Sequence, residues 1–380
     1  MMARRSVWAA VGVLLVVAIG LGIWLGLYPP WSKGAHGVAI GALLPLTGSG
    51  ATYGQNAQRG IDLALGSLRA AGGTQAQTLR VIYEDSQMNP QVGISGAHKL
   101  IDVDGVPAII GEMASTVTLA VAPVCEKSRV VLMSPASSNP QLTNAGDYIF
   151  RDCLSDVYEG GVMATMAKQK LGFQRVAILY INNDYGVGLR DVFSTEFKRL
   201  GGAIVDVEAF EQDATDFRTQ LSKIAAQRPD AVFLLGYKEM IQVLVQSVEL
   251  GLHFQFLSTV MFDDPEILKQ AGSAAEGVVF TTWAYEPAGG YAPASTFKAQ
   301  YLAKYGSEPG IFSAEAYDAM ILIGNAIEDG AGTGSQIRDA LYRVSGYQGA
   351  SGIITIDKNG DTTKPLMLKV VRNGQFQFLQ

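Results

Sequence analysis

The chain has 380 residues, of which 48% are hydrophobic and 17% are charged, enough for two or three domains with a large core. Its formal net charge is −6 and no stripe of Lys and Arg occurs, which argues against nucleic-acid binding because phosphate contacts need clustered cations. The three histidines are far apart and none has a Cys or carboxylate at ligand spacing, so we expect no metal site.

The first 36 residues are predicted to be a signal or membrane anchor. Arg4 and Arg5 precede a mostly apolar run over 7–27, which is the pattern of an export sequence. The run is long enough to cross a bilayer, it ends in Leu27-Tyr-Pro-Pro-Trp31, and no small-residue cleavage pattern follows it. We favour an uncleaved anchor with everything after Lys33 outside the inner membrane, and a cleaved signal that frees the chain in the periplasm is the alternative.

From Val38 onward, short apolar runs alternate with amphipathic stretches. In the first half we expect strands at 38–44, 79–83, 107–110 and 130–133, and helices at 55–68, 90–103 and 117–127. Short strands that alternate with helices are typical of βαβ units. The pattern therefore predicts a parallel sheet with helices on both faces.

The same alternation restarts near 148–151. In the second half we expect strands at 175–180, 203–208, 231–235, 254–257 and 278–281, and helices at 157–170, 188–200, 217–227 and 239–250. Towards the C-terminus we expect helices at 293–304, 312–326 and 337–344, then a hairpin of strands 352–356 and 365–371 around an Asn359-Gly360 turn. The fold class is therefore α/β, with two doubly wound, Rossmann-like lobes.

The sequence contains no intact motif for binding a cofactor or a metal ion, or for catalysis. Gly48-Ser-Gly-Ala-Thr-Tyr-Gly54 has the wrong spacing for a dinucleotide fingerprint and lacks its acidic partner, so we interpret it as a loop whose glycines let backbone approach a ligand or the facing lobe. The loop from Asp357 lacks the glycine offset and the Glu of a calcium site. No nucleophile elbow or phosphate loop occurs. We expect a non-catalytic protein without a cofactor; a dehydrogenase-like α/β enzyme is the alternative.

The two cysteines leave two possibilities open. The expected fold places Cys125 and Cys153 in the same lobe, so they could form one disulfide in an oxidising compartment. Otherwise they are two small buried hydrophobic side chains.

Hydroxyl-bearing residues follow two predicted strands of the first lobe, at the edge where open α/β sheets bind ligands. Ser115 and Thr116 begin a helix, where they either cap it or, with its free N–H groups and positive dipole end, bind a carboxylate. A loop over 134–140, braced by two prolines, contains Ala136 and Ser138 and could present donors at fixed positions.

Aromatic residues follow two predicted strands of the second half. Tyr185 and Tyr237 occupy equivalent positions after the strands 175–180 and 231–235. They either line a ligand cleft or close the core with a solvent-facing hydroxyl, and their equivalence favours the cleft.

Several short segments occur in a characteristic order along the chain: 38–48 with Tyr53-Gly54, Gly72-Gly73, Glu84-Asp85, Asn89-Pro90, 111–116, Pro135-Ala136 with Pro140, Asp184-Tyr185-Gly186, Gly236-Tyr237 and Ala316-Tyr317. Taken together, they resemble the Leu/Ile/Val-binding family of type I periplasmic binding proteins. The likeness runs from about Val38 to the C-terminus, and the order and spacing are its specific part.

The resemblance implies two lobes that are each discontinuous in sequence and are joined by three crossover strands. The implied ranges are 37–150 plus 284–350 for the first lobe and 151–283 plus 351–380 for the second, with crossings near 148–151, 281–283 and 349–352. Members of the family are non-catalytic receptors that deliver small solutes, often amino acids, to an ABC permease in the inner membrane. A membrane-anchored ligand sensor without transport is the alternative.

The resemblance also implies a ligand site between the lobes. The first lobe would hold a ligand carboxylate through Ser115, Thr116 and Ser138, and the carbonyl of Ala136 would accept from an ammonium group. The rings that would line the cleft and enclose the ligand on hinge closure are Tyr53, Tyr185, Tyr237 and Tyr317.

One departure from the family bears on the ligand. Its amino-acid binders usually place an acidic residue after the last second-lobe strand, to pair with the ligand ammonium. Here the matching place is Val260 or Met261, and Asp263 and Asp264 come a few residues later. If one aspartate reaches the cleft, we expect an α-amino acid. If neither does, we expect a carboxylate without an amine, or an amide, because an unpaired buried ammonium is costly.

Overall fold

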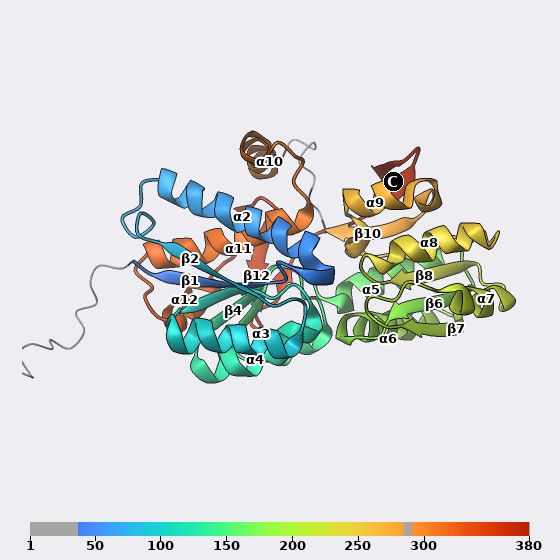
Figure 1. The fold of residues 1–380 in the computed structure, drawn as a ribbon, viewed down its shortest axis with the longest axis horizontal. Helices are drawn as coiled ribbons and strands as arrows, with labels where there is room; N and C mark the ends of the chain where they lie inside the picture. The colour runs from blue at the N-terminus through green and yellow to red at the C-terminus, as the bar shows by residue number, and fades with distance from the viewer. Residues whose placement is uncertain (1–36, 284, 286–290, 380) are drawn as a thin grey trace, which may run out of the picture. The chain divides into compact units, whose positions relative to one another are not determined.

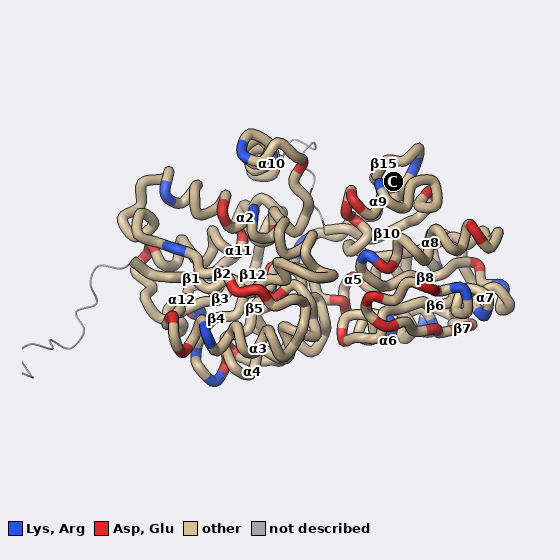
Figure 2. The backbone as a smooth tube through the Cα atoms, in the orientation of Figure 1, with Lys and Arg blue, Asp and Glu red and all other residues tan. Residues whose placement is uncertain are grey.

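Two sheets organise the computed structural model, which describes residues 37–283, 285 and 291–379 (Figure 1). The predicted signal or anchor over 1–36 lies outside the described residues. Across the part of the chain that is described, no helix has both the length and the hydropathy of a membrane span. Lysines and arginines are dispersed among the acidic residues (Figure 2).

The first sheet is parallel throughout and has the order β2-β1-β3-β4-β5. Its strands are β1 (Ala39–Leu44), β2 (Arg80–Asp85), β3 (Ala108–Gly111), β4 (Val131–Ser134) and β5 (Ile149–Arg151), and its main helices are α2 (Ala51–Ala70), α3 (Pro90–His98), α4 (Ser115–Ser128), α11 (Ile311–Glu328) and α12 (Gly334–Leu341). Helices α2 and α11 pack together on one face, and α3 and α4 on the other (Figure 1). The central strands are fully buried because both faces are covered, which explains their apolar sequences.

The second sheet has the order β15-β14-β10-β9-β8-β6-β7. Its parallel strands are β6 (Arg175–Ile181), β7 (Ala203–Phe210), β8 (Ala231–Leu235), β9 (Phe256–Ser258) and β10 (Val279–Trp283), and β14 (Leu366–Arg372) and β15 (Gln375–Phe378) add an antiparallel edge. Its helices are α5 (Asp156–Thr165), α6 (Asp184–Arg199), α7 (Arg218–Ala226), α8 (Glu239–Glu249) and α9 (Pro265–Ala271). The predicted doubly wound α/β architecture is therefore present in both halves.

The C-terminal region differs from the predicted hairpin. β12 (Gly352–Ile356) pairs with β11 (Tyr347–Gly349) and β13 (Thr362–Thr363), whereas β14 pairs with β10. Arg151 N, at the end of β5, donates to Gly360 O, which ties this small sheet to the first lobe. The third passage between the lobes therefore lies between Thr363 and Leu366, later than the predicted crossing near 349–352. The other two passages follow β5 and β10.

A fully buried ion cluster lies at this third passage. Lys364 Nζ is 2.9 Å from Asp152 Oδ1, forms an ion pair with Glu315 and donates to Ser351 Oγ at 2.6 Å. Asp318 accepts from the backbone N and the hydroxyl of Ser351 at 2.7 and 2.6 Å. The Lys364 ammonium thus pairs directly with two carboxylates, and its charge also acts on a third, Asp318, at the junction of two passages and α11.

Both cysteines are free and buried in the structure. Cys125 lies on α4, and Cys153 donates from Sγ to Ser137 O at 3.3 Å. The sequence left two possibilities open, and the structure shows the second: Cys125 and Cys153 are small buried side chains without a disulfide. Burial raises the pKa of the Cys125 thiol to about 12, so this thiol is not a reactive thiolate at neutral pH.

Candidate functional site

Glu112, directly after β3, organises the strand ends of the first lobe. Its carboxylate accepts from Ser86 Oγ at 2.7 Å and from Ala114 N at 2.5 Å. Its carbonyl accepts from Ser134 Oγ at 2.6 Å and Ser137 Oγ at 3.0 Å. The side chain is fully buried, and burial raises the pKa of Glu112 to about 7. These bonds tie the ends of β2, β3 and β4 together and fix the loops that carry the predicted carboxylate-binding residues.

Those residues are Ser115, Thr116, Ala136 and Ser138, and the structure brings them together. Ser115, Ala136 and Ser138 are only 2%, 5% and 3% exposed. The capping role considered for Ser115 is wrong: Ala114 occupies the N-cap position of α4, and Ser115 Oγ instead accepts from Asn139 N at 3.3 Å. The Ser115 hydroxyl therefore keeps its own proton available for an acceptor.

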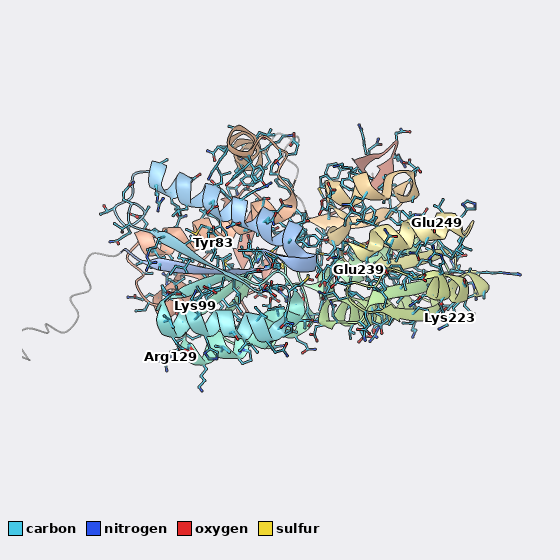
Figure 3. The ribbon with its side chains drawn as sticks, viewed as in Figure 1. Tyr83, Lys99, Arg129, Lys223, Glu239 and Glu249 are labelled. Atoms are coloured by element: carbon cyan, nitrogen blue, oxygen red, sulfur yellow. The ribbon has the colours of Figure 1, made fainter. Side chains whose placement is uncertain are left out.

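Three predicted tyrosines form one ring cluster with contributions from both lobes. Tyr185 and Tyr237 stack with ring centroids 5.5 Å apart, and Tyr53 of α2 meets Tyr237 edge-on at 6.1 Å. Each is 3% exposed. Tyr185 is oriented by a 2.6 Å bond between its hydroxyl and Thr259 Oγ1. The backbone N of Tyr237 donates to Glu239, labelled at the start of α8 in Figure 3, at 3.2 Å.

The fourth predicted tyrosine lies elsewhere. Tyr317 packs against Phe297 of α10 (Ala292–Tyr305), with ring centroids 5.0 Å apart, and among the described residues its ring makes no contact with the cluster. Its place is taken by Phe312, which meets Tyr53 at 5.4 Å and Trp283 at 6.0 Å. Residues five apart in a helix point in different directions, so Phe312 and Tyr317 lie on different faces of α11, and Phe312 is the one that meets Tyr53.

The two aspartates considered for the ligand ammonium are engaged in other contacts. Asp263 accepts from Lys369 Nζ at 2.7 Å and from Thr282 Oγ1 at 2.5 Å. Asp264 caps α9 by accepting from Glu266 N at 2.8 Å, and burial raises its pKa. Neither Asp263 nor Asp264 is therefore included in the ligand set that we propose below.

Two buried carboxylates at the start of α5 were missed by the sequence analysis. Glu159 Oε1 accepts from Val260 N at 2.9 Å and from Thr281 Oγ1 at 2.6 Å, so this acid lies beside Val260, one of the two places where the resemblance implies an acidic residue. Asp156 lies one turn earlier on the same face, and its backbone N donates to Ser138 O at 2.8 Å. The sequence feature that could have indicated them is the Asp156-x-x-Glu159 spacing, which places two acids on one face of a helix directly after a passage between the lobes.

These two acids have spare hydrogen-bonding capacity in a dry environment. Both are 0% exposed, and neither oxygen of Asp156 nor Oε2 of Glu159 accepts a bond of ordinary geometry from the described residues. Burial and then the charge of Glu159 raise the pKa of Asp156, although the nearby Ser138 hydroxyl partly opposes this, and burial raises the pKa of Glu159 to about 7. Both charges act on the Tyr185 hydroxyl, which places them beside the ring cluster. A cationic group bound between these acids would offset the free-energy cost of burying their charged forms.

Comparison with known proteins gives the family. The family model described as "Periplasmic binding protein" matches residues 37–375. The leucine-binding protein LivK from Thermotoga maritima is 34% identical, with a TM-score of 0.83, and the match covers 90% of this chain and 98% of that one. The chain belongs to the Leu/Ile/Val-binding family of periplasmic binding proteins.

Other members of the family are similarly related to this periplasmic binding protein. LivJ from Streptococcus pneumoniae, solved in complex with isoleucine, is 28% identical with a TM-score of 0.84, over 90% of this chain and 98% of that chain. Leu/Ile/Val-binding protein homolog 1 from Brucella abortus is 26% identical over 99% of this chain and 100% of its own length. The predicted family and fold are confirmed, and membership of a family of binding proteins agrees with the prediction that the chain is not an enzyme.

The two lobes of this periplasmic binding protein are in contact beside the site. Asp184 N, at the start of α6, donates to Thr116 Oγ1 at 3.2 Å, and Asn139 Nδ2 donates to Asp184 O at 2.5 Å. Gln212 Nε2 reaches Ser49 Oγ at 2.8 Å. These bonds join loops of the first lobe to the second lobe, as hinge closure over a ligand requires.

The contact between the lobes is tightly packed at Gly188. A Cβ at this position would lie 2.8 Å from Asn139 Nδ2 and 3.2 Å from Pro140 Cδ, across the contact between lobes. We expect Gly188→Ala to weaken ligand binding by about five- to tenfold, since the lobes must part slightly, without lowering the stability of the unliganded protein. Gly161→Ala on α5, where a Cβ would meet nothing within 4 Å, is the matched control. Titration calorimetry compares the two, and wild-type affinity in Gly188→Ala would contradict this contact.

Proposed function

We propose that this protein is the extracytoplasmic solute receptor of an ABC importer, and that it binds a small molecule carrying both a carboxylate and an ammonium group. The observation that carries the proposal is Asp156, a buried carboxylate without a hydrogen-bond partner of ordinary geometry among the described residues. It lies beside Ser138 and the tyrosine cluster at the strand ends. The names of the relatives, which refer to leucine, isoleucine and valine, support an α-amino acid.

The two charged groups of the proposed ligand fit neighbouring parts of the site, because Asp156 N donates to Ser138 O at 2.8 Å. The carboxylate would be held by Ser115, Ser138 and the N–H groups at the start of α4, where the helix dipole favours an anion. The ammonium would be held by Asp156 and Glu159, together with the carbonyl of Ala136. The aromatic walls are Tyr53, Tyr185, Tyr237, Phe312 and Trp283, and they suit an apolar ligand side chain.

We also propose that the N-terminal segment stays attached and anchors the receptor beside its permease in the inner membrane. The support is the apolar run over 7–27 behind Arg4 and Arg5. Intact mass of the protein from native membranes tests this, and a mature chain that begins near Lys33 and is free in the periplasm would refute it. Such an anchored receptor could also act as a ligand sensor. Uptake assays in a strain that lacks the gene separate transport from sensing.

A thermal-shift screen tests the proposed ligand class directly. The screen should compare amino acids with carboxylates and amides of the same size, such as leucine with 4-methylpentanoate and leucinamide. A ligand at about 100 times its dissociation constant adds ~2.7 kcal/mol to the free energy of unfolding. Leucine should raise the melting temperature, and both analogues should fail to do so. A response to 4-methylpentanoate equal to that of leucine would remove the ammonium site from the proposal.

The hydroxyls of Ser115 and Ser138 are expected to contribute to affinity rather than to stability. Bonds to a charged acceptor contribute about 1.5–3 kcal/mol each, so Ser115→Ala and Ser138→Ala should each weaken binding by roughly ten- to a hundredfold. The double variant should be less than additive because both hydroxyls bind one carboxylate. Calorimetry with melting curves checks this. Unchanged affinity in both single variants would end the carboxylate-clamp hypothesis.

A further inference from the structure

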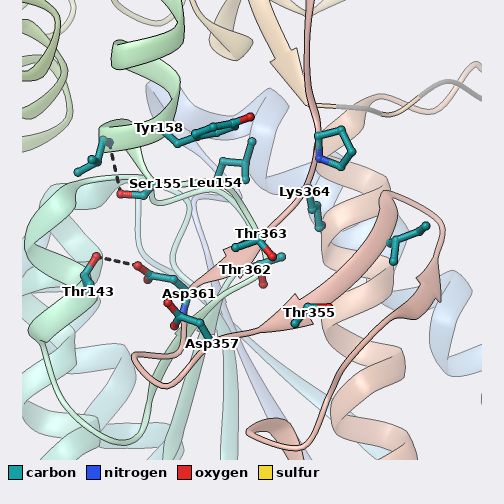
Figure 4. A pocket seen from close by; sticks show the side chains of 13 residues that line it. Thr143, Leu154, Ser155, Tyr158, Thr355, Asp357, Asp361, Thr362, Thr363 and Lys364 are labelled. Carbon is teal, nitrogen blue, oxygen red and sulfur yellow. Dashed lines mark hydrogen bonds between the residues drawn. The ribbon is translucent and has the colours of Figure 1, made fainter. Parts of the chain in front are cut away.

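A groove of about 900 Å³ lies outside the ligand site, at the junction of the lobes (Figure 4). One wall is the start of α5, with Leu154, Val157 and Tyr158. The opposite wall is formed by β12 and the third passage, with Ile353 and Pro365. None of the lining residues belongs to the ligand set proposed above.

The apolar character of the groove is unusual for this surface. Val157, Tyr158 and Ile353 are 57%, 49% and 48% exposed, and they are three of the seven large hydrophobic side chains that are exposed in the described chain. All three line this one groove. Exposed apolar side chains are ordinary when scattered, but their concentration in a concave surface marks a binding site.

The polar residues that line the groove indicate which polar group a bound molecule would carry. Hydroxyls of Thr143, Ser155, Thr355 and Thr363 line its margin. Asp361 is paired with Arg151 at 2.7 Å, and the ammonium of Lys364 points into the buried cluster described above.

Asp357 is the remaining charged residue of the lining. Its Oδ1 accepts only from the backbone N of Asn359 and Asp361, and no ion pair to it is found among the described residues. The groove therefore presents one negative charge without a cation that faces it, so it favours an ammonium or hydroxyl head over a carboxylate.

We infer that this groove is a second ligand site, which takes a small amphipathic molecule with an apolar body and an ammonium or hydroxyl head. Its volume is in the range of small-molecule sites, about 300–1,000 Å³. Helix α5 packs on α6 in the second lobe, whereas β12 pairs with β11 and β13 beside the first. An occupant therefore contacts both lobes at once.

Three probes that differ only in their head group test the inference: hexylamine, 1-hexanol and hexanoate, titrated into the full chain by ligand-observed NMR. Hexylamine should bind most tightly and hexanoate most weakly. The double variant Val157→Ser/Ile353→Ser should weaken hexylamine binding about tenfold, since it removes two apolar contacts. Val248→Ser, at an equally exposed position (54%) on α8, is the matched control and should change nothing.

Two further variants make the result decisive. Asp357→Asn should remove the preference for hexylamine over 1-hexanol without affecting 1-hexanol. Asp156→Asn changes the proposed ligand site and not the groove, so it should leave hexylamine binding unchanged. A loss of hexylamine binding in this variant would place the amine at the ligand site and overturn the inference. Equal binding of the three probes, or wild-type binding in Val157→Ser/Ile353→Ser, would also overturn it.

Discussion

Replacing Asp156 by asparagine is expected to weaken binding of an α-amino acid by about a hundredfold, ~2.7 kcal/mol, because the ligand ammonium loses a buried charged partner. The same change should raise the free energy of unfolding of the unliganded protein at pH 8. The folded-state pKa of Asp156 is raised by burial and by Glu159, so its ionised form opposes folding above the unfolded pKa. Loss of affinity together with a gain of stability is a signature that a merely structural residue would not produce.

Calorimetry and urea denaturation measure the two effects. Asp191→Asn, which removes a charge from an exposed side chain on α6, is the control and should change neither. Wild-type affinity in Asp156→Asn would show that the ammonium binds elsewhere.

The pH dependence of the wild-type protein gives a second check on the same acids. Burial raises the pKa of Glu159 to about 7, and a proton held there must leave when the ammonium arrives. Affinity should therefore fall as the pH is lowered, by about tenfold between pH 8 and pH 6 for one such group. The double variant Asp156→Asn/Glu159→Gln should flatten the profile.

Replacing Lys364 by methionine is expected to lower the free energy of unfolding by about 3–5 kcal/mol, because Asp152, Glu315 and Asp318 would remain buried without a cation. The ammonium and its partners Asp152 and Glu315 have no exposed side-chain surface, so solvent does not screen the loss. Lys223→Met is the control, because Lys223 is 58% exposed and forms an ion pair with Glu208 at the surface. This variant should lower the free energy of unfolding by less than about 1 kcal/mol. Urea denaturation at pH 7.5 compares the two variants.

Lowering the pH should reduce the loss of stability caused by Lys364→Met. Burial raises the pKa of Glu315 well above its usual range and that of Asp318 to about 7, so the unpaired acids take up protons in the folded state as the pH falls. The combined variant Lys364→Met/Glu315→Gln should recover part of the stability for the same reason, and it keeps the test possible if Lys364→Met alone fails to fold. Equal destabilisation by Lys364→Met and Lys223→Met would contradict this role for the cluster.

Local patterns in the sequence determined the architecture and the positions of several residues of the candidate site. The apolar runs of β1, β3, β4, β6 and β8 predict strands buried on both faces, and the structure has them in two parallel sheets. Residues that directly follow a strand were also predictable in position, because the carboxyl ends of parallel strands share one edge of the sheet. The positions of Ser115, Ser138, Tyr185 and Tyr237 after their strands were predicted in this way.

Only the tertiary structure decided which side chains lie beside these residues. The acid near Val260 is Glu159, supplied by a helix that precedes it by about a hundred positions in the chain, and no spacing rule relates the two. Phe312 rather than Tyr317 meets Tyr53 because packing of α11 against α2 sets which face of the helix turns inward. Sequence periodicity reports that a helix has a buried face. Which neighbour covers it, and which charges share the buried space, depends on contacts between segments that are distant in the chain.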